Sequence, residues 1–124
     1  MGSTSRQRGL VVLDYEPDAG DIAFINFDPQ TGKEQAKNRP ALILTERLWN
    51  VTTGLLVACP ITSARKGWGS HVPLSGSNTT AGFVMTEQVK SLDWKARGAR
   101  FVERAPHRVL QETRNALAVI LGLP

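Results

Sequence analysis

Apolar and polar residues follow one another along the chain in a pattern that predicts several short strands and then one helix. The apolar and aromatic run at 21–27 ends in the turn-forming residues 28–32, which indicates a first strand and a turn. A second strand is expected at 41–44, with Arg39-Pro40 opening it, because proline is tolerated at the first residue of a strand. The fully apolar run at 55–59 predicts a third, buried strand.

The middle of the chain alternates between short strands and polar connections. A helical turn is expected at 46–50, a loop at 61–70 and a turn at 76–80. Four further strands are expected at 71–74, 83–86, 89–91 and 99–103. These strands are too closely spaced for parallel crossovers, so the pattern favours a small curled β-barrel.

The last part of the chain has a helical period instead. Its apolar face is predicted to consist of Val109, Leu110, Thr113, Leu117, Ile120 and Leu121. Pro106 near the first turn and Gly122 after the last turn are typical helix boundaries. We therefore expect a mainly β domain with one amphipathic helix packed at its C-terminal end.

The length of 124 residues supports a single domain, which we expect to span 11–124. Residues 1–10 contain no apolar signal core and are expected to be a flexible leader or a cloning remnant. No apolar run approaches the roughly 20 residues that span a bilayer. The lone Cys59 lies in an apolar run, where it is expected to be a small hydrophobic residue, and it fits a cytoplasmic protein.

Positive charge gathers in the middle of the sequence. The net charge is +4, and residues 31–100 alone carry ten basic and four acidic side chains. Such a concentration suits a polyanion or an acidic protein partner. A merely basic, solvated surface would produce the same count, so charge by itself leaves both interpretations open.

Motifs for metal, cofactor or acyl-transfer chemistry are missing from the sequence. It contains no CxxC, no HExxH, no phosphate-binding glycine loop and no GxSxG elbow, so neither a metal nor a cofactor is expected. Its two histidines, His71 and His107, would permit an acid–base ribonuclease. They are far apart in the sequence, and a surface or helix-end histidine is the more common interpretation of each.

Two polar spots stand out beside the predicted strands. The loop 31–40 offers a carboxylate, an amide, two ammonium groups and a guanidinium, and it ends with Arg39 at a strand. Thr62-Ser63 follows the buried third strand. A group at the edge of a strand is better positioned than one at a loop tip, but each spot alone is also typical of a solvated loop.

At these positions the sequence resembles the MazF/PemK toxins. The resemblance rests on an ordered set of short pieces: Gly20-Asp21, Phe27-Asp28-Pro29, Gly32-x-Glu34-Gln35, Arg39-Pro40-Ala41, Pro60-x-Thr62, the run from Glu87 to Trp94, and Arg97-Gly98. It extends from about Asp18 to the terminal helix. The segment 69–86 departs most from the pattern, with a polar turn at 77–80, and this leaves the recognised RNA sequence open.

The resemblance implies an SH3-like β-barrel, a homodimer and an mRNA interferase that cleaves single-stranded motifs. It also implies an acidic, partly disordered antitoxin that covers the RNA site. The family's active-site residues carry over to Arg39, Thr62 and Glu34.

RNA supplies its own nucleophile, the 2′-hydroxyl, so the expected products are a 2′,3′-cyclic phosphate (or 3′-phosphate) and a 5′-hydroxyl, without a metal. Arg39 can bind two phosphate oxygens and Thr62 can add a hydrogen bond. A guanidinium is a reluctant base and Glu34 is the better chemical candidate, so the base stays open between Arg39 and Glu34.

Further side chains are expected to bind the RNA around this centre. They are Lys33, Gln35, Lys37, Arg65, Lys66, Trp68, Gln88 and Lys90. The cations would contact phosphates and Gln88 would contact a base edge. Trp68 either stacks on a base or packs on the barrel, and Trp94 is expected to be structural or to lie at the dimer face.

Two rivals belong to other functional classes. One is a non-catalytic toxin of the CcdB kind, which binds DNA gyrase and is expected to act through its terminal helix. The other is an SH3-like RNA-binding module without chemistry. Incubation with a long single-stranded RNA in excess EDTA separates all three, because only the enzyme yields discrete fragments with 5′-hydroxyl ends.

Overall fold

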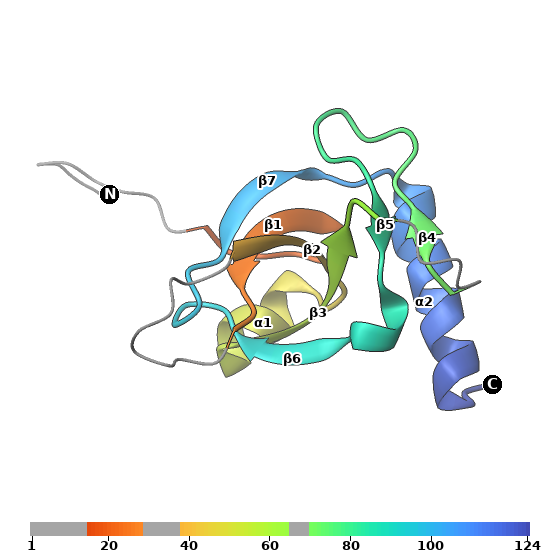
Figure 1. Ribbon diagram of the computed structural model, residues 1–124. Helices are drawn as coiled ribbons and strands as arrows, with labels where there is room; N and C mark the ends of the chain where they lie inside the picture. Colours follow the sequence, from red (N-terminus) through yellow and green to blue (C-terminus); the bar gives the residue numbers. More distant parts are fainter. Residues whose placement is uncertain (1–14, 29–37, 65–69) are drawn as a thin grey trace, which may run out of the picture.

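The computed structural model describes residues 15–28, 38–64 and 70–124. Its strands are β1 (Asp21–Asn26), β2 (Asn38–Ile43), β3 (Leu55–Thr62), β4 (Val72–Pro73), β5 (Phe83–Val84), β6 (Lys90–Asp93) and β7 (Arg100–Arg104). Its helices are α1 (Arg47–Thr53), the 3-10 helix η1 (Thr86–Gln88) and α2 (His107–Leu121). Figure 1 shows β7 arching over one side of the sheet, β6 running below it, and α2 standing beside it.

All the strand pairings are antiparallel and they form one curled sheet. Its order is β4-β5-β3-β2-β1-β7, and β6 pairs with the first half of β3. Within the described residues β6 and β7 do not pair, so the sheet is a half-barrel with a gap between these two edges. The expected mainly β fold with a C-terminal helix is confirmed. The described strands form a strongly curled sheet that does not close into a complete barrel.

Alternate residues of the sheet form two separate cores. On one face Ile22, Leu42 and Cys59 pack with Val109, Leu110 and Leu117 of α2. On the other face, the inner side of the curl, Ala23, Ile25, Ala41, Ile43 and Ala58 pack with Leu92 and Trp94. Because strand side chains alternate between the faces, neighbouring residues on each strand enter different cores.

Helix α2 buries one stripe, but a shorter one than its period predicts. Val109, Leu110, Thr113 and Leu117 are buried. Ile120 and Leu121 are 48% and 62% exposed, so their predicted place on the core face is wrong. The helix runs one turn beyond the sheet that covers its other apolar residues, and ends at Gly122 in a left-handed conformation.

Two connections differ from the sequence prediction. Residues 61 and 62 belong to β3, not to a loop, because this part of β3 gains a partner in β5. Thr86 begins a 3-10 helix instead of ending a strand, and its hydroxyl donates to the Ser70 carbonyl oxygen at 2.9 Å. The other predicted strands and the helical turn are present with boundaries moved by a few residues.

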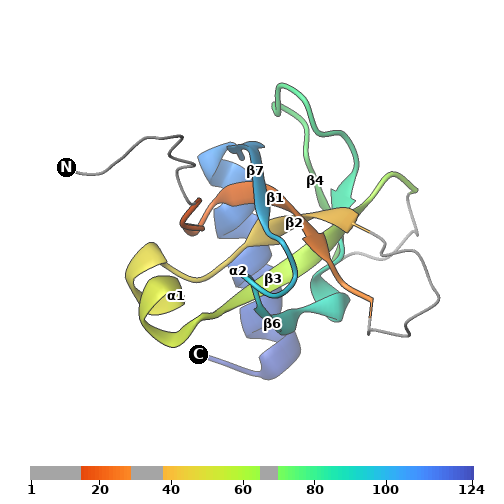
Figure 2. The ribbon, with the colours of Figure 1, turned by 90° about the vertical axis from the view of Figure 1, so that its left-hand side faces the viewer.

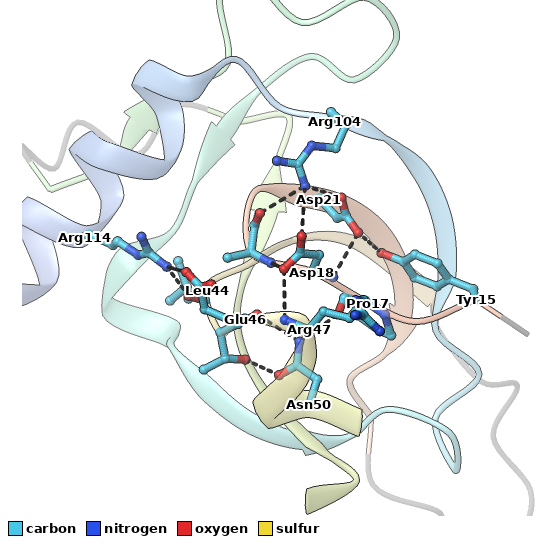
Figure 3. A network of polar contacts seen from close by, with 12 residues as sticks. Tyr15, Pro17, Asp18, Asp21, Leu44, Glu46, Arg47, Asn50, Arg104 and Arg114 are labelled. Atoms are coloured by element: carbon cyan, nitrogen blue, oxygen red, sulfur yellow. Dashed lines mark hydrogen bonds and ion pairs between the residues drawn. The ribbon is translucent and has the colours of Figure 1, made fainter. Parts of the chain in front are cut away.

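A polar network fixes the start of β1 (Figure 3). The buried Asp21 carboxylate accepts hydrogen bonds from the Tyr15 hydroxyl at 2.5 Å and from Arg104 at 2.8 Å. The buried Asn50 side chain donates to the carbonyl oxygens of Pro17 and Thr45. The network connects the segment before β1 to α1 and to β7. The other end of β1, at Asn26, takes no part in it.

Candidate active site

Arg39 lies in β2 at the end of the sheet away from the Asp21 network. It is exposed, and its backbone pairs with Ile25 of β1. Since side chains two residues apart share a face, Arg39 lies on the same face as Ala41 and Ile43. Both of these belong to the inner core. The guanidinium therefore stands at the rim of the inner face, on a strand that is paired on one side by β1.

Thr62 is the last residue of β3 and is half-buried. It pairs with Phe83 of β5, and its hydroxyl accepts a hydrogen bond from the Ala64 N–H at 3.1 Å. This local turn fixes the hydroxyl, which keeps its own proton for donation. Thr62 shares a face with Pro60 and Ala58, and Ala58 belongs to the inner core.

The strand register brings these two residues to neighbouring positions. β2 and β3 pair with Ala41 opposite Pro60. The observed pairing ends there; the same register continued by two residues on each strand would set Arg39 opposite Thr62, on one face and at one end of the sheet. Side chains in this relation have Cβ atoms about 5 Å apart, so both can reach one phosphate. Figure 2 shows the start of β2 beside the end of β3.

Lys90 and Gln88 lie on the other side of β3. Lys90 is exposed and pairs with Ala58, so its side chain lies on the inner face, as that of Thr62 does. Ala58 precedes Thr62 by four residues in β3, which separates Lys90 from Thr62 by roughly 13 Å along the strand direction. Lys90 is therefore too far away to bind the same phosphate as Thr62, but it can bind a neighbouring one. Gln88 is exposed in η1, which is fixed to β3 by the hydrogen bond from the Met85 N–H to the Pro60 carbonyl oxygen at 2.9 Å.

Seven of the predicted site residues lie outside the described part of the chain. They are Lys33, Glu34, Gln35, Lys37, Arg65, Lys66 and Trp68. The described residues that flank them, Asp28 and Asn38 on one side and Ala64 on the other, lie at the Arg39 end of the sheet, because Asn26 pairs with Asn38. Their own positions stay predictions.

His71 corrects one expectation. A surface histidine is the more common interpretation of its sequence position, but the side chain is only 2% exposed. Its Nε2 lies 3.0 Å from Glu87 Oε1. Position along the chain carries no signal for this pair, since the two residues are 16 apart and meet only because β4 and β5 are adjacent. His107 is exposed at the start of α2, as a helix-end histidine.

Cys59 is not a nucleophile. It is fully buried in the core that α2 covers. Burial raises the pKa of the thiol to about 12, and the charge of Glu87 acts in the same direction. Thiolate chemistry at neutral pH is therefore excluded at this residue, as its apolar sequence context indicates.

Arg97 holds the end of β1, a contact that the sequence did not predict. Its guanidinium donates to the carbonyl oxygens of Asn26 at 2.9 Å and of Asp28 at 3.5 Å. Its own carbonyl oxygen accepts from the Asn26 N–H at 3.1 Å. The turn between β6 and β7 thus fixes the strand end that faces the start of β2. Trp94, in the same turn, is buried and donates to the Asn50 carbonyl oxygen, which confirms a structural role.

In the residues that the structure describes, no three His, Cys, Asp or Glu side chains are grouped so that they could hold a metal ion. The same residues include no helix with the length and apolar character needed to cross a membrane.

Comparison with known proteins gives consistent results. A family model described as "PemK-like, MazF-like toxin of type II toxin-antitoxin system" matches residues 18–121. The endoribonuclease toxin MazF of Escherichia coli is 38% identical over 112 residues, covering 90% of this chain and all of MazF. The endoribonuclease PemK of Escherichia coli is 36% identical over 118 residues, covering 92% of this chain and 89% of PemK.

Solved structures are similar over the same region. The crystal structure of MazF from Deinococcus radiodurans has a TM-score of 0.81 at 44% identity, covering 89% of this chain and 100% of that one. A MazE-MazF complex from the same organism contains a chain with a TM-score of 0.83 at 43% identity, covering 90% and 100%. The similarity spans the curled sheet and the terminal helix together.

Proposed function

Since the chain belongs to the PemK-like, MazF-like toxin family and is one of its endoribonuclease toxins, we propose that it cleaves single-stranded mRNA with Arg39 and Thr62 at the scissile phosphate. The observation that supports this proposal is the register of β2 and β3, which pairs Ala41 with Pro60 and, continued by two residues, would set Arg39 opposite Thr62 on one face. A guanidinium and a hydroxyl side by side at a strand end suit the binding of one phosphodiester.

Arg39 stabilises the phosphate as charge develops on it. Its planar guanidinium can donate two parallel hydrogen bonds to two non-bridging oxygens. Thr62 adds a third, neutral donor. Donors that are fixed before the reaction starts are worth about 10²- to 10³-fold in kcat each, because they need no reorganisation in the transition state.

The reaction uses the 2′-hydroxyl of the RNA as its nucleophile. A base removes the proton of this hydroxyl, the new P–O bond closes a 2′,3′-cyclic phosphate, and the bond to the 5′-oxygen breaks as that oxygen takes up a proton. The base is either Arg39 or Glu34. None of these steps uses a metal.

The main experiment is cleavage of a long single-stranded RNA in excess EDTA, followed by end mapping. We expect discrete fragments with 5′-hydroxyl ends. Arg39→Ala is expected to lower kcat by at least about 10²-fold, and Thr62→Ala by about as much with little change in RNA affinity. Ser63→Ala, next to Thr62 but on the other face of the chain, is the matched control and retains activity.

Two further variants separate the candidate bases. If Glu34 is the base, Glu34→Gln abolishes the acidic limb of the pH–rate profile while Arg39→Lys retains it. If Arg39 is the base, Glu34→Gln keeps the profile of the wild type. RNA that stays intact with the wild-type protein and EDTA overturns the proposal as a whole.

We further propose the assembly that the family implies: a homodimer in the cytoplasm, inhibited by an acidic antitoxin. Two groups of exposed apolar side chains support contacts with protein partners. One is Leu48, Trp49, Val51 and Leu55, and the other is Val119, Ile120, Leu121 and Leu123. Light scattering on the free protein is expected to give twice the chain mass of 13.5 kDa; the chain mass itself would contradict the dimer.

A further inference from the structure

A hollow of about 250 Å³ opens in the gap between β6 and β7, the two unpaired edges of the half-barrel. Its lining comes from the segment before β1 and from the turn that joins β6 to β7: Tyr15, Trp94, Lys95, Gly98 and Ala99. None of these residues takes part in the site described above, and the volume admits one planar base.

Its aromatic walls are held rigidly from behind. The Tyr15 hydroxyl donates to Asp21, and its ring centroid lies 5.5 Å from that of Phe101. Burial, together with the hydrogen bond to Asp21 and its charge, raises the pKa of Tyr15 far above the ordinary value, so this phenol stays a neutral donor. Trp94 is 5% exposed, so Tyr15 offers the larger surface for stacking, and Trp94 is held by its bond to the Asn50 carbonyl oxygen at 2.9 Å. A fixed aromatic wall loses little entropy when a ring stacks on it.

A cation stands at the mouth of the hollow. The Lys95 ammonium lies 5.5 Å from the centroid of the Trp94 ring and is exposed. Aromatic walls combined with a positive rim are typical of surfaces that bind single-stranded nucleic acid, where bases stack and cations contact phosphates.

The hollow is aligned with Arg39 across the sheet. β1 pairs with β7 as far as Phe24 and Arg100. The same register continued by one residue would set Ile25 opposite Ala99. Ile25 pairs with Arg39. In this register Ala99, Ile25 and Arg39 form one row over three strands, which separates the hollow from Arg39 by roughly 10 Å. Figure 2 shows the β6–β7 turn in front of the sheet on this side.

We propose that this hollow binds an unpaired base of the RNA a short distance from the scissile phosphate, with Lys95 on an adjoining phosphate. The inference rests on the proposed function, because it extends the substrate path of the same enzyme from the Arg39 end of the sheet to the gap between β6 and β7.

The test measures binding and cleavage separately. The binding probe is a fully 2′-O-methylated RNA of about ten nucleotides, which has no nucleophile and cannot be cut. Tyr15→Leu is expected to weaken its binding about tenfold, and Lys95→Glu by a similar factor. Tyr15→Phe keeps the ring but loses the hydrogen bond to Asp21 that holds it, so its affinity is expected to lie between those of the wild type and Tyr15→Leu. Arg108→Gln, which removes one positive charge from α2 behind the other face, is the control for charge. This control is expected to stay within about twofold of the wild type.

Cleavage kinetics distinguish a substrate-binding role from damage to the fold. Tyr15→Leu and Lys95→Glu are expected to raise KM for long RNA and to leave kcat unchanged. They are expected to leave both constants unchanged for an RNA too short to reach the hollow. Lys95 is exposed and its ammonium lies over the edge of the core at the Trp94 ring. Because a substitution at the surface costs little stability, its variant tests the inference even where Tyr15→Leu fails to fold.

Normal binding and normal KM in Lys95→Glu, with a wild type that cleaves RNA, would overturn this inference and leave the proposed function intact. A wild type that neither binds the probe nor cleaves RNA would overturn both.

Discussion

Asp21 is the carboxylate on which the start of the sheet depends. It is 4% exposed, and it accepts hydrogen bonds from the Tyr15 hydroxyl, from the Asp18 N–H and from Arg104 (Figure 3). A buried charge is tolerated here because each of its oxygens has donors and a cation stands beside it.

Asp21→Asn is therefore expected to lower the free energy of unfolding by about 1–3 kcal/mol, because the amide nitrogen cannot accept the bonds that one carboxylate oxygen accepts now. Urea denaturation at neutral pH measures the change. Glu112→Gln, which breaks only an exposed pair with Arg108, is the control and is expected to stay within about 0.5 kcal/mol of the wild type. Equal effects of the two variants would contradict the role of Asp21.

Glu103 provides a second prediction, in this case with a pH dependence. Burial alone would raise its pKa, but the hydrogen bonds from Thr80, Asn78 and Thr79 outweigh it, so the pKa lies below its ordinary 4.5. A carboxyl with a lowered folded-state pKa contributes stability above its unfolded-state pKa and loses that contribution as the pH falls. Glu103→Gln is expected to be less stable than the wild type at neutral pH, with the difference shrinking on acidification below about 4.5. A melting-temperature difference that is constant with pH would argue against this.

Strand β3 is the element that assembles the candidate site. Its first half pairs with β6, its second half pairs with β5, and β2 runs along its other side. Thr62 therefore owes its position to β5 as well as to β2. Gly82, just before β5, has a φ of +124°, and a Cβ there would fall against the Thr62 carbonyl oxygen.

Gly82→Ala is expected to separate β5 from the end of β3 and so displace Thr62. The predicted result is a loss of RNA cleavage approaching that of Thr62→Ala, accompanied by about 1 kcal/mol or more of destabilisation from the strained φ. Gly54→Ala is the matched control, because it also replaces a glycine of positive φ (+77°) but meets no atom within 4 Å. If both variants cleave equally well, β5 does not position Thr62.

The elements that sequence predicted well are those whose signal is local. The β1 strand, the α2 helix and the opening of β2 at Arg39-Pro40 follow from apolar periodicity and from the backbone limits of proline. The errors arise where a partner distant in sequence decides the outcome. Residues 61 and 62 became strand because β5 pairs with them, and His71 is buried because Glu87 lies beside it.

The same distinction holds for the site. Arg39 and Thr62 were predicted from short motifs, and their alignment follows only from the register of β2 and β3. The clamp of Arg97 on Asn26 joins residues 71 apart, and no local pattern announces it. The hollow at Tyr15 likewise depends on the gap between β6 and β7, which strand periodicity does not determine.

The charges of the whole molecule act together on an approaching ligand. The net charge is +4. Arg39 lies at the start of β2, Lys90 at the start of β6, and Lys95 in the turn after β6. A substrate with one negative charge per nucleotide is drawn to such a surface from a distance, and neighbouring phosphates can occupy different cations. RNA affinity is therefore expected to fall steeply as salt is added.

Lys90 tests how this attraction is divided among the cations. It lies about four residues along β3 from Thr62 and contacts a different phosphate from the one at Arg39, so Lys90→Ala is expected to weaken binding without changing kcat. Removing one phosphate contact should reduce the slope of log affinity against log salt by roughly 0.7, the value for a single strand. Anisotropy titrations of the 2′-O-methylated RNA at several salt concentrations measure that slope.

Arg108→Gln is the control. It also removes one positive charge from the molecule, but from α2, and is expected to leave the slope unchanged. If Arg108→Gln reduces the slope as much as Lys90→Ala does, only the net charge of the protein attracts the RNA, and Lys90 contacts no phosphate.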